Sequence, residues 1–307
     1  MNTVSIRASG VIGCCILAFA LGAPETASAQ AAKPAAPDRA AAIRGCTGTY
    51  SGAPRGNDGR VEVRRLVEQL KDLHADTYSW LIWPADTDWD DLQTFLPLAR
   101  EAGVRVWVTL VPPSESPPRT KRFSEPFRLD YERWAVEIAR LSVAHANLVA
   151  WSIDDFTHNL AFFTPEKVRG IVAGARSINP GLAFVPCSYF PGVTARFSAG
   201  YAGSIDGILF PYRHESNKAN LTDATLLKPE LARLRELLGP DVPIIVDVYS
   251  TAHSRLGAST PQYVRDVLTQ ARESADGVMV YCHPDPAGKD AAKYPVVREV
   301  FAAPVKR

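Results

Sequence analysis

The stretch Asn147–Ile178, NLVAWSIDDFTHNLAFFTPEKVRGIVAGARSI, contains one complete unit of the pattern that decides the fold. It opens with a short apolar run, Asn147–Asp155, that ends in two acidic residues. A run of this length bounded by turn residues is typical of a buried strand. A loop follows, and Thr164-Pro165 then marks the start of an amphipathic helix, because threonine caps helices and proline is favoured in their first turn.

The same unit recurs along the chain on both sides of this stretch. Strands are expected at Arg44–Tyr50, Thr77–Trp83, Val104–Pro112, Asn147–Asp155, Leu182–Phe190, Gly207–Arg213, Val242–Ser250 and Gly277–His283. Helices are expected at Val61–His74, Trp89–Ala102, Tyr131–His145, Pro165–Ile178, Ala224–Leu238, Pro261–Ser274 and Ala291–Phe301. The fifth connection, around Thr194–Tyr201, has the least regular helical pattern.

This alternation predicts the α/β class and a single-domain (β/α)8 TIM barrel. Strands that alternate with helices of about 10–15 residues form βαβ units around a parallel sheet. Eight such units in about 260 residues match the number and length at which the sheet closes into a barrel. The alternative is an open, doubly wound sheet. No G-x-G-x-x-G turn follows the first strand, so nucleotide binding has no support.

The first 29 residues have the parts of a secretory signal peptide. Arg7 supplies a positive charge, Val11–Ala23 forms an apolar core, and Ala27–Ala29 matches an A-x-A cleavage signature before Gln30. A lipoprotein signal with Cys14 as the acceptor would place the apolar core after the cysteine instead of before it. The core is shorter than the ~20 residues of a spanning helix. We therefore expect a secreted or periplasmic protein with no membrane anchor after cleavage.

The composition is that of a globular protein, with 46% hydrophobic and 22% charged residues. Residues 30–43, rich in Ala and Pro, are expected to form a disordered spacer before a barrel domain at 44–307. The net charge of +1, without a basic stripe, excludes nucleic acid as a probable partner class.

Three cysteines remain after signal cleavage, Cys46, Cys187 and Cys282, so one disulfide at most can form. The first and last strands adjoin in a closed barrel, which can bring Cys46 and Cys282 near each other. A bond would need their Cα atoms within ~7 Å. No C-x-x-C pair supports a structural zinc site.

Acidic residues at strand ends are the candidate catalytic groups, because barrel active sites lie at the carboxyl ends of the strands. Asp154 and Asp155 end the fourth strand, where two adjacent carboxylates repel each other unless one is protonated or turned away. Asp247 interrupts the apolar run of the seventh strand, and a buried carboxylate needs a partner. Glu115 follows the third strand. The structural alternatives are loop capping by the Asp154-Asp155 pair and a salt bridge from Asp247 to Arg213 or to a neighbouring strand.

These acids fit glycosidic cleavage, which needs one carboxylic acid to protonate the leaving oxygen and one carboxylate to attack or activate water. We expect Asp155 and Asp247 to react and Asp154 to raise the pKa of the acid through its like charge. Aromatic rings pack against the apolar face of a sugar. The expected substrate-binding residues near the strand ends are Trp80, Trp83, Tyr189, Tyr212, Arg213, Glu215, Tyr249, Tyr281 and His283.

A metal-dependent hydrolase is an alternative, because Asp154, Asp155 and His158 lie close together in the sequence. No H-x-H or H-x-x-x-H spacing supports it, and no G-x-S-x-G elbow supports a serine esterase. The other alternative is an inactive barrel that binds glycan or another cell-surface partner, because the fold does not settle the activity. The favoured reading has a carbohydrate substrate and no cofactor.

At Trp151–Phe156 and Pro243–Tyr249 the chain resembles the superfamily of (β/α)8-barrel glycoside hydrolases. In its retaining clan A, the fourth strand ends in Asn-Glu, whose Glu is the acid/base, and the seventh ends in a nucleophilic Glu. The resemblance therefore implies an acid/base role for Asp155 and a nucleophile or base role for Asp247.

The matching positions here carry Asp instead of Glu, which is shorter by one methylene, so the two carboxyl groups can be farther apart. A separation of about 5 Å suits retention and about 6.5–9.5 Å suits inversion. The chain is also similar to barrel glycosidases with catalytic Asp residues on strands four and six. That likeness implies Asp154 as nucleophile and Glu215 in place of the acid.

Overall fold

The fold is that of a computed structural model, which describes Met1 and residues 37–304. Of the expected signal peptide, residues 2–29 lie outside the described residues, as do residues 30–36 of the expected spacer. The remaining chain forms one compact unit. No helix among residues 37–304 is long and apolar enough to span a lipid bilayer.

Eight parallel strands form the sheet, in the order β5-β4-β3-β2-β1-β10-β7-β6. They are β1 Thr47–Tyr50, β2 Thr77–Ile82, β3 Arg105–Leu110, β4 Leu148–Ile153, β5 Ala183–Phe184, β6 Ile208–Pro211, β7 Ile244–Tyr249 and β10 Gly277–Tyr281. A parallel bridge between Cys187 and Leu209 joins the two ends of this order. There Leu209 N donates to Pro186 O at 3.1 Å, and Ser188 N donates to Leu209 O at 2.8 Å. The predicted (β/α)8 barrel is therefore confirmed.

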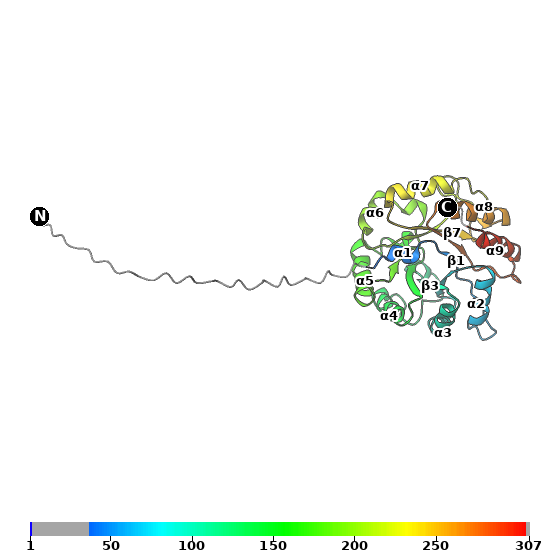
Figure 1. Cartoon of the computed structure of the whole chain (residues 1–307), viewed down its shortest axis with the longest axis horizontal. Coiled ribbons are helices and arrows are strands. Elements are labelled where there is room, and N and C mark those ends of the chain that lie inside the picture. The colour runs from blue at the N-terminus through cyan, green and yellow to red at the C-terminus, as the bar shows by residue number, and fades with distance from the viewer. Residues whose placement is uncertain (2–36, 305–307) are drawn as a thin grey trace, which may run out of the picture. The chain divides into compact units, whose positions relative to one another are not determined.

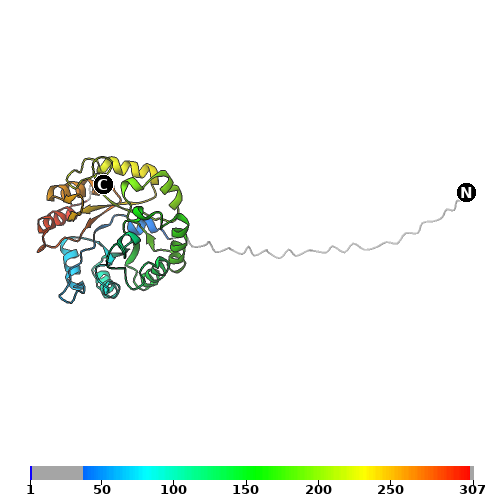
Figure 2. The same ribbon diagram turned by 180° about the vertical axis from the view of Figure 1, so that it is seen from behind.

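Helices connect the strands and surround them (Figures 1 and 2). They are α2 Val63–Asp72, α3 Asp88–Glu101, α4 Tyr131–Ala144, α5 Pro165–Ile178, α6 Ala195–Tyr201, α7 Leu227–Leu238, α8 Pro261–Ser274 and α9 Tyr294–Ala302. Side chains cap several of their starts: Thr164 Oγ1 accepts from Lys167 N, and Thr260 Oγ1 accepts from Tyr263 N. The irregular fifth connection also forms a helix, α6, with Thr194 as its cap.

Alternate side chains of each strand point to different parts of the core. On β3, Val106 and Val108 pack in the large cluster between the sheet and the helices, whereas Trp107 packs in the barrel interior. The interior cluster also contains Leu209 and Met279. Apolar side chains therefore fill the barrel up to the level at which polar residues begin, near the carboxyl ends of the strands.

The end of the expected spacer is not disordered. Arg39–Ile43 forms helix α1, which lies inside the ring of outer helices in both ribbon views (Figures 1 and 2). Ile43 is fully buried in the interior cluster, and Arg39 Nε lies 2.7 Å from Asp206 Oδ1. A Cβ on Gly207 would lie 2.6 Å from Ile43 Cδ1, so this glycine provides the space for Ile43. The folded body thus begins before residue 44, because an apolar side chain covers one end of the barrel.

Cys46 and Cys282 do not form a disulfide, and Cys187 is also free. In the parallel pair β1–β10, Thr47 lies opposite Val278 and Tyr50 opposite Tyr281. Cys46 precedes β1 and Cys282 follows β10, so the two thiols lie at opposite ends of the barrel.

Candidate functional site

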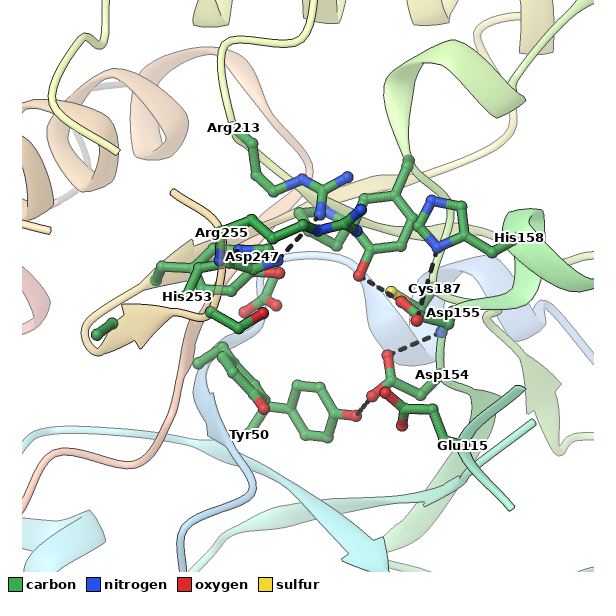
Figure 3. A pocket seen from close by; sticks show the side chains of 16 residues that line it. Tyr50, Glu115, Asp154, Asp155, His158, Cys187, Arg213, Asp247, His253 and Arg255 are labelled. Atoms are coloured by element: carbon green, nitrogen blue, oxygen red, sulfur yellow. Dashed lines mark hydrogen bonds and ion pairs between the residues drawn. The ribbon is translucent and has the colours of Figure 1, made fainter. Parts of the chain in front are cut away.

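A pocket of about 290 Å³ lies at the carboxyl ends of the strands (Figure 3). Its lining residues come from strand ends and the loops that follow them. They are Tyr50, Glu115, Asp154, Asp155, His158, Cys187, Tyr189, Pro211, Arg213, Asp247, Tyr249, Ala252, His253, Ser254, Arg255 and Tyr281. The three aspartates that were predicted to be catalytic thus lie together in one cavity, at the end of the barrel where catalysis is expected.

Asp154 directly follows β4 and extends its ladder, with Asp154 N donating to Leu110 O at 2.8 Å. The hydroxyl of Tyr50, the last residue of β1, donates a 2.7 Å hydrogen bond to Asp154 Oδ2. Burial, together with the charge of Asp155, raises the pKa of Asp154 to about 6, although the hydrogen bond from Tyr50 acts in the opposite direction.

Asp155 has a left-handed backbone, with φ of 44°, an uncommon conformation for a residue with a side chain. Neighbouring residues of an extended strand point to opposite faces, but this turn lets both aspartates line the pocket. Tyr189 donates a 2.5 Å hydrogen bond to Asp155 Oδ1, and His158 Nδ1 lies 3.5 Å from Oδ2. Burial acts to raise the pKa of Asp155, but these contacts and the charges of His158 and Arg213 outweigh it and hold the pKa below its ordinary value.

Glu115 ends the short 3-10 helix η1, Pro113–Glu115, after β3. Its side chain is half-buried in the pocket, and none of the described residues donates a hydrogen bond to its carboxyl group. Burial and the negative charges of Asp154 and Asp155 raise the pKa of Glu115 to about 8. This carboxyl group is therefore predominantly protonated at neutral pH and is free to contact a ligand.

Asp247 lies on β7 at the bottom of the pocket and is 2% exposed. Burial, followed by the charge of Asp154, raises its pKa well above the ordinary value. Its Oδ1 atom is buried and has no hydrogen-bond partner among the described residues. No salt bridge joins Asp247 to Arg213 within residues 37–304, so that structural alternative is not realised.

A layer of stacked groups supports Asp155 from the side of β5 and β6. The rings of His158 and Tyr189 are nearly parallel, 8° apart, with centroids separated by 4.3 Å. The guanidinium of Arg213 lies 3.9 Å from the centroid of the Tyr189 ring and pairs with Glu215. Glu215 Oε2 in turn accepts a 3.2 Å hydrogen bond from Phe190 N. Glu215 is therefore a partner of Arg213 behind the pocket and does not line it.

Four of the nine residues expected to bind substrate line the pocket: Tyr189, Arg213, Tyr249 and Tyr281. The structure places Trp80, Trp83, Tyr212 and His283 elsewhere. Trp80 packs against Phe95 behind the sheet, and Trp83 packs at the edge of the interior cluster. Tyr212 is fully buried and stacks on Tyr263.

His283 bonds to Thr49 and Gln69, and burial lowers its pKa to about 4.

The metal alternative finds no support in the donor arrangement. In the part of the chain that the structure describes, no group of three or more His, Cys, Asp or Glu side chains is arranged to hold a metal ion. His158 instead directs Nδ1 at Asp155.

Strand-end position alone would also have identified Tyr50 as a pocket residue, because it is the last residue of β1. His253 also follows the end of an expected strand, Val242–Ser250, whereas Arg255 has no such signal. They lie on the hairpin formed by β8 Ala252–His253 and β9 Gly257–Ala258, which an apolar repeat does not predict.

No protein-family model and no curated protein sequence matches the chain. Solved structures do match it. A glucosidase from Croceicoccus marinus is similar over 84% of this chain and 67% of its own, with 14% identity and a TM-score of 0.57. A GH113 beta-1,4-mannanase is similar over 84% of this chain and 99% of its own, with 12% identity and a TM-score of 0.57.

An endoglucanase from Pseudomonas stutzeri is similar over 84% of this chain and 94% of its own, with 12% identity and a TM-score of 0.56. At these identities the likeness shows that this chain shares the barrel fold of those enzymes. The activity of the chain depends on the residues of its own pocket.

Proposed function

We propose that this chain is a glycoside hydrolase that cleaves a glycan by carboxylate acid/base chemistry. The observation that carries the proposal is the convergence of Glu115, Asp154, Asp155 and Asp247 on one cavity, with their pKa values driven apart. Carboxyl groups whose environments separate their pKa values can act as acid and base at the same pH.

In the proposed reaction, Glu115 is the general acid and its proton passes to the leaving glycosidic oxygen. Asp155 is the ionised carboxylate, which either attacks the anomeric carbon or takes a proton from the attacking water. This assignment differs from the one implied by the resemblance, in which Asp155 is the acid/base. A pKa held below the ordinary value makes Asp155 a poor proton donor, whereas a pKa of about 8 suits Glu115 to that role.

Asp154 and Asp247 are assigned supporting roles in the same reaction. The charge of Asp154 helps Glu115 to keep its proton. Burial favours the protonated form of Asp247 and its Oδ1 atom has no hydrogen-bond partner among the described residues, so we assign it to hydrogen bonding with a sugar hydroxyl. In the resemblance Asp247 matches a nucleophile, but its raised pKa disfavours the ionised form that a nucleophile needs.

Two further observations support a glycan as the substrate. The rings of Tyr189, Tyr249 and Tyr281 line the cavity, where they can pack against the C–H face of a sugar. The structures that share the fold include a glucosidase, a beta-1,4-mannanase and an endoglucanase. The N-terminal 29 residues extend the proposal to a secreted or periplasmic enzyme without a membrane anchor.

The direct test is release of reducing ends by the purified full-length protein from a panel of polysaccharides and aryl glycosides. We expect turnover of at least one, with Asp155→Asn reducing it by about 100-fold or more. Asp86→Asn is the matched control, because Asp86 is exposed, follows β2 at the same end of the barrel and does not line the pocket.

If glycans of the panel bind to the protein but none is cleaved, the protein is a glycan-binding barrel and not a hydrolase. If a chelator abolishes turnover and a divalent ion restores it, the protein is a metal-dependent hydrolase. Export is tested separately, by sequencing the N-terminus of the protein recovered outside the cytoplasm, where Gln30 is expected as the first residue.

A further inference from the structure

Most of the charged groups around the pocket are segregated by sign, with Asp247 beside His253 and Arg255, and His158 beside Asp155, as the exceptions. Figure 3 shows Glu115, Asp154 and Asp155 along one side of the cavity and Arg213, His253 and Arg255 along another. The acids come from the loops after β3 and β4, whereas the basic groups come from the end of β6 and the β8–β9 hairpin. A substrate that extends from one side to the other therefore meets reacting carboxyl groups at one end and guanidinium groups at the other.

Arg213 is held in a fixed position and has an N–H group that donates no hydrogen bond to any of the described residues. It is 6% exposed and is held by its ion pair with Glu215 and by the ring of Tyr189. Its Nη1 lies at the limit of hydrogen bonding to His253 Nε2, at 3.5 Å. Its Nε is buried without a hydrogen-bond partner among the described residues. A buried N–H group without an acceptor is costly, and a ligand that brings an acceptor removes that cost.

Arg255 adds a second guanidinium from the turn of the hairpin. The residue is exposed, its backbone N donates to His253 Nδ1 at 3.1 Å, and its side chain borders the pocket. Within residues 37–304 no carboxylate forms an ion pair with it. Burial and the charges of Arg213 and Arg255 lower the pKa of the intervening His253. This side of the pocket is therefore electropositive.

We propose that the site is specific for acidic glycans and that Arg213 and Arg255 bind the carboxylate of a uronic acid residue. This inference rests on the proposed function, because it names the substrate class of the same site. A planar carboxylate matches the fork of N–H donors of a guanidinium. An ordinary neutral sugar offers hydroxyl groups, which leave Arg255 without a counter-charge, whereas Arg213 is already paired with Glu215.

The acidic side of the pocket does not exclude such a substrate. Burial raises the pKa of Glu115 to about 8 and raises that of Asp247 well above its ordinary value, which favours the uncharged form of both. The remaining negative charge is concentrated at Asp154 and Asp155, of which Asp155 already contacts His158 and Tyr189. Arg255 lies on the side of the cavity away from these two charges, whereas Arg213 is near enough to Asp155 to offset part of its negative charge.

The test measures binding of tetrasaccharides of glucuronate and galacturonate to the full-length protein, against neutral tetrasaccharides of glucose and galactose with matched linkages. We expect at least one acidic ligand to bind about tenfold more tightly than its neutral counterpart, with the preference decreasing as salt concentration rises. Arg255→Gln should weaken acidic binding by at least about threefold and by a larger factor than it weakens neutral binding, so that the preference for the acidic ligand decreases.

Arg119→Gln is the control, since Arg119 is an exposed arginine after β3 that does not line the pocket. Equal binding of acidic and neutral ligands, or a preference that survives Arg255→Gln, would overturn the inference. A third ligand is a tetrasaccharide of neutral sugars to which one sulfate ester has been added, so that its negative charge is not a carboxylate. Binding of that ligand alone would overturn the carboxylate assignment. Arginine-dependent binding of uronates without cleavage would leave the inference standing and remove the proposed function. Cleavage of neutral glycans only would support the proposed function and overturn the inference about acidic glycans.

Discussion

The hydroxyl of Tyr189 donates a 2.5 Å hydrogen bond to Oδ1 of Asp155 and, together with the contact from His158, lowers the pKa of this carboxyl group. Tyr189 itself is held in place by the stacked ring of His158 and by the guanidinium of Arg213. A donor fixed in this way favours the charged form of the carboxyl group that accepts from it. Asp155 therefore stays ionised while its neighbours Glu115 and Asp154 have raised pKa values.

Removing this donor should shift the acidic limb of activity. In Tyr189→Phe the charged form of Asp155 loses a hydrogen bond, so its pKa rises and activity is lost at a higher pH on the acidic side. A hydrogen bond to a charged group contributes about 1.5–3 kcal/mol, which corresponds to a displacement of about one pH unit or more. The measurement is kcat/KM against pH. Tyr201→Phe is the control, because its hydroxyl bonds to Phe163 O away from the pocket.

Replacing the proposed acid should remove the alkaline limb. Wild-type activity is expected to fall as pH rises through about 8, where Glu115 loses its proton. Glu115→Gln carries no transferable proton, so we expect kcat to drop by about 100-fold or more and the limb near pH 8 to disappear. Aryl glycosides with acidic leaving groups need less protonation and should retain much more activity. An equal loss on good and poor leaving groups would contradict the role of Glu115.

The fold could be predicted because the barrel repeats one pattern. All eight strands lie within their expected ranges, since each is a buried apolar run followed by turn residues. Helix α1 was missed because its five residues carry a single buried apolar side chain, Ile43, and so have no period to detect. Its burial depends on the space above Gly207, which is a tertiary contact between segments far apart in the chain.

The candidate site could be predicted only in part. Strand-end position placed Asp154, Asp155 and Asp247 correctly in one cavity, because parallel strands bring their carboxyl ends together. Strand-end position could not predict which of these carboxyl groups is protonated and which is ionised. That difference depends on the hydroxyl of Tyr189 and on the desolvation of Glu115, which are set by distances that no sequence spacing encodes.

The buried carboxyl group of Asp247 should make stability depend on pH. Its pKa is raised in the folded protein, so the native state retains a proton that the unfolded chain releases above about pH 4. Stability from this group is therefore fully present at low pH and decreases as pH rises. Asp247→Asn removes this dependence on pH. The Tm of the variant minus that of the wild type should therefore be larger at pH 8 than at pH 4, by about 2–4 °C for each kcal/mol of unfolding free energy that the wild type loses between the two pH values.

Two further variants serve as controls for the Tm measurement. Asp86→Asn changes an exposed residue and should show the same Tm difference at both pH values. Asp155→Asn should show the opposite trend, because the pKa of Asp155 is lowered and its carboxylate stabilises the fold above the unfolded pKa. A Tm difference for Asp247→Asn that does not vary with pH would mean that Asp247 is not a protonated buried group.

Helix α1 should contribute to stability through Ile43, although it lies in a segment whose composition indicates a spacer. Ile43 is fully buried beside Cys46 in the barrel interior, so Ile43→Ala should leave a cavity and lower the free energy of unfolding by about 2–5 kcal/mol. Val143→Ala removes methyl groups from a side chain that is 64% exposed and should change it by less than about 0.5 kcal/mol. Urea unfolding of the full-length protein measures both. A cost for Ile43→Ala as small as that for Val143→Ala would mean that α1 does not close the barrel in solution.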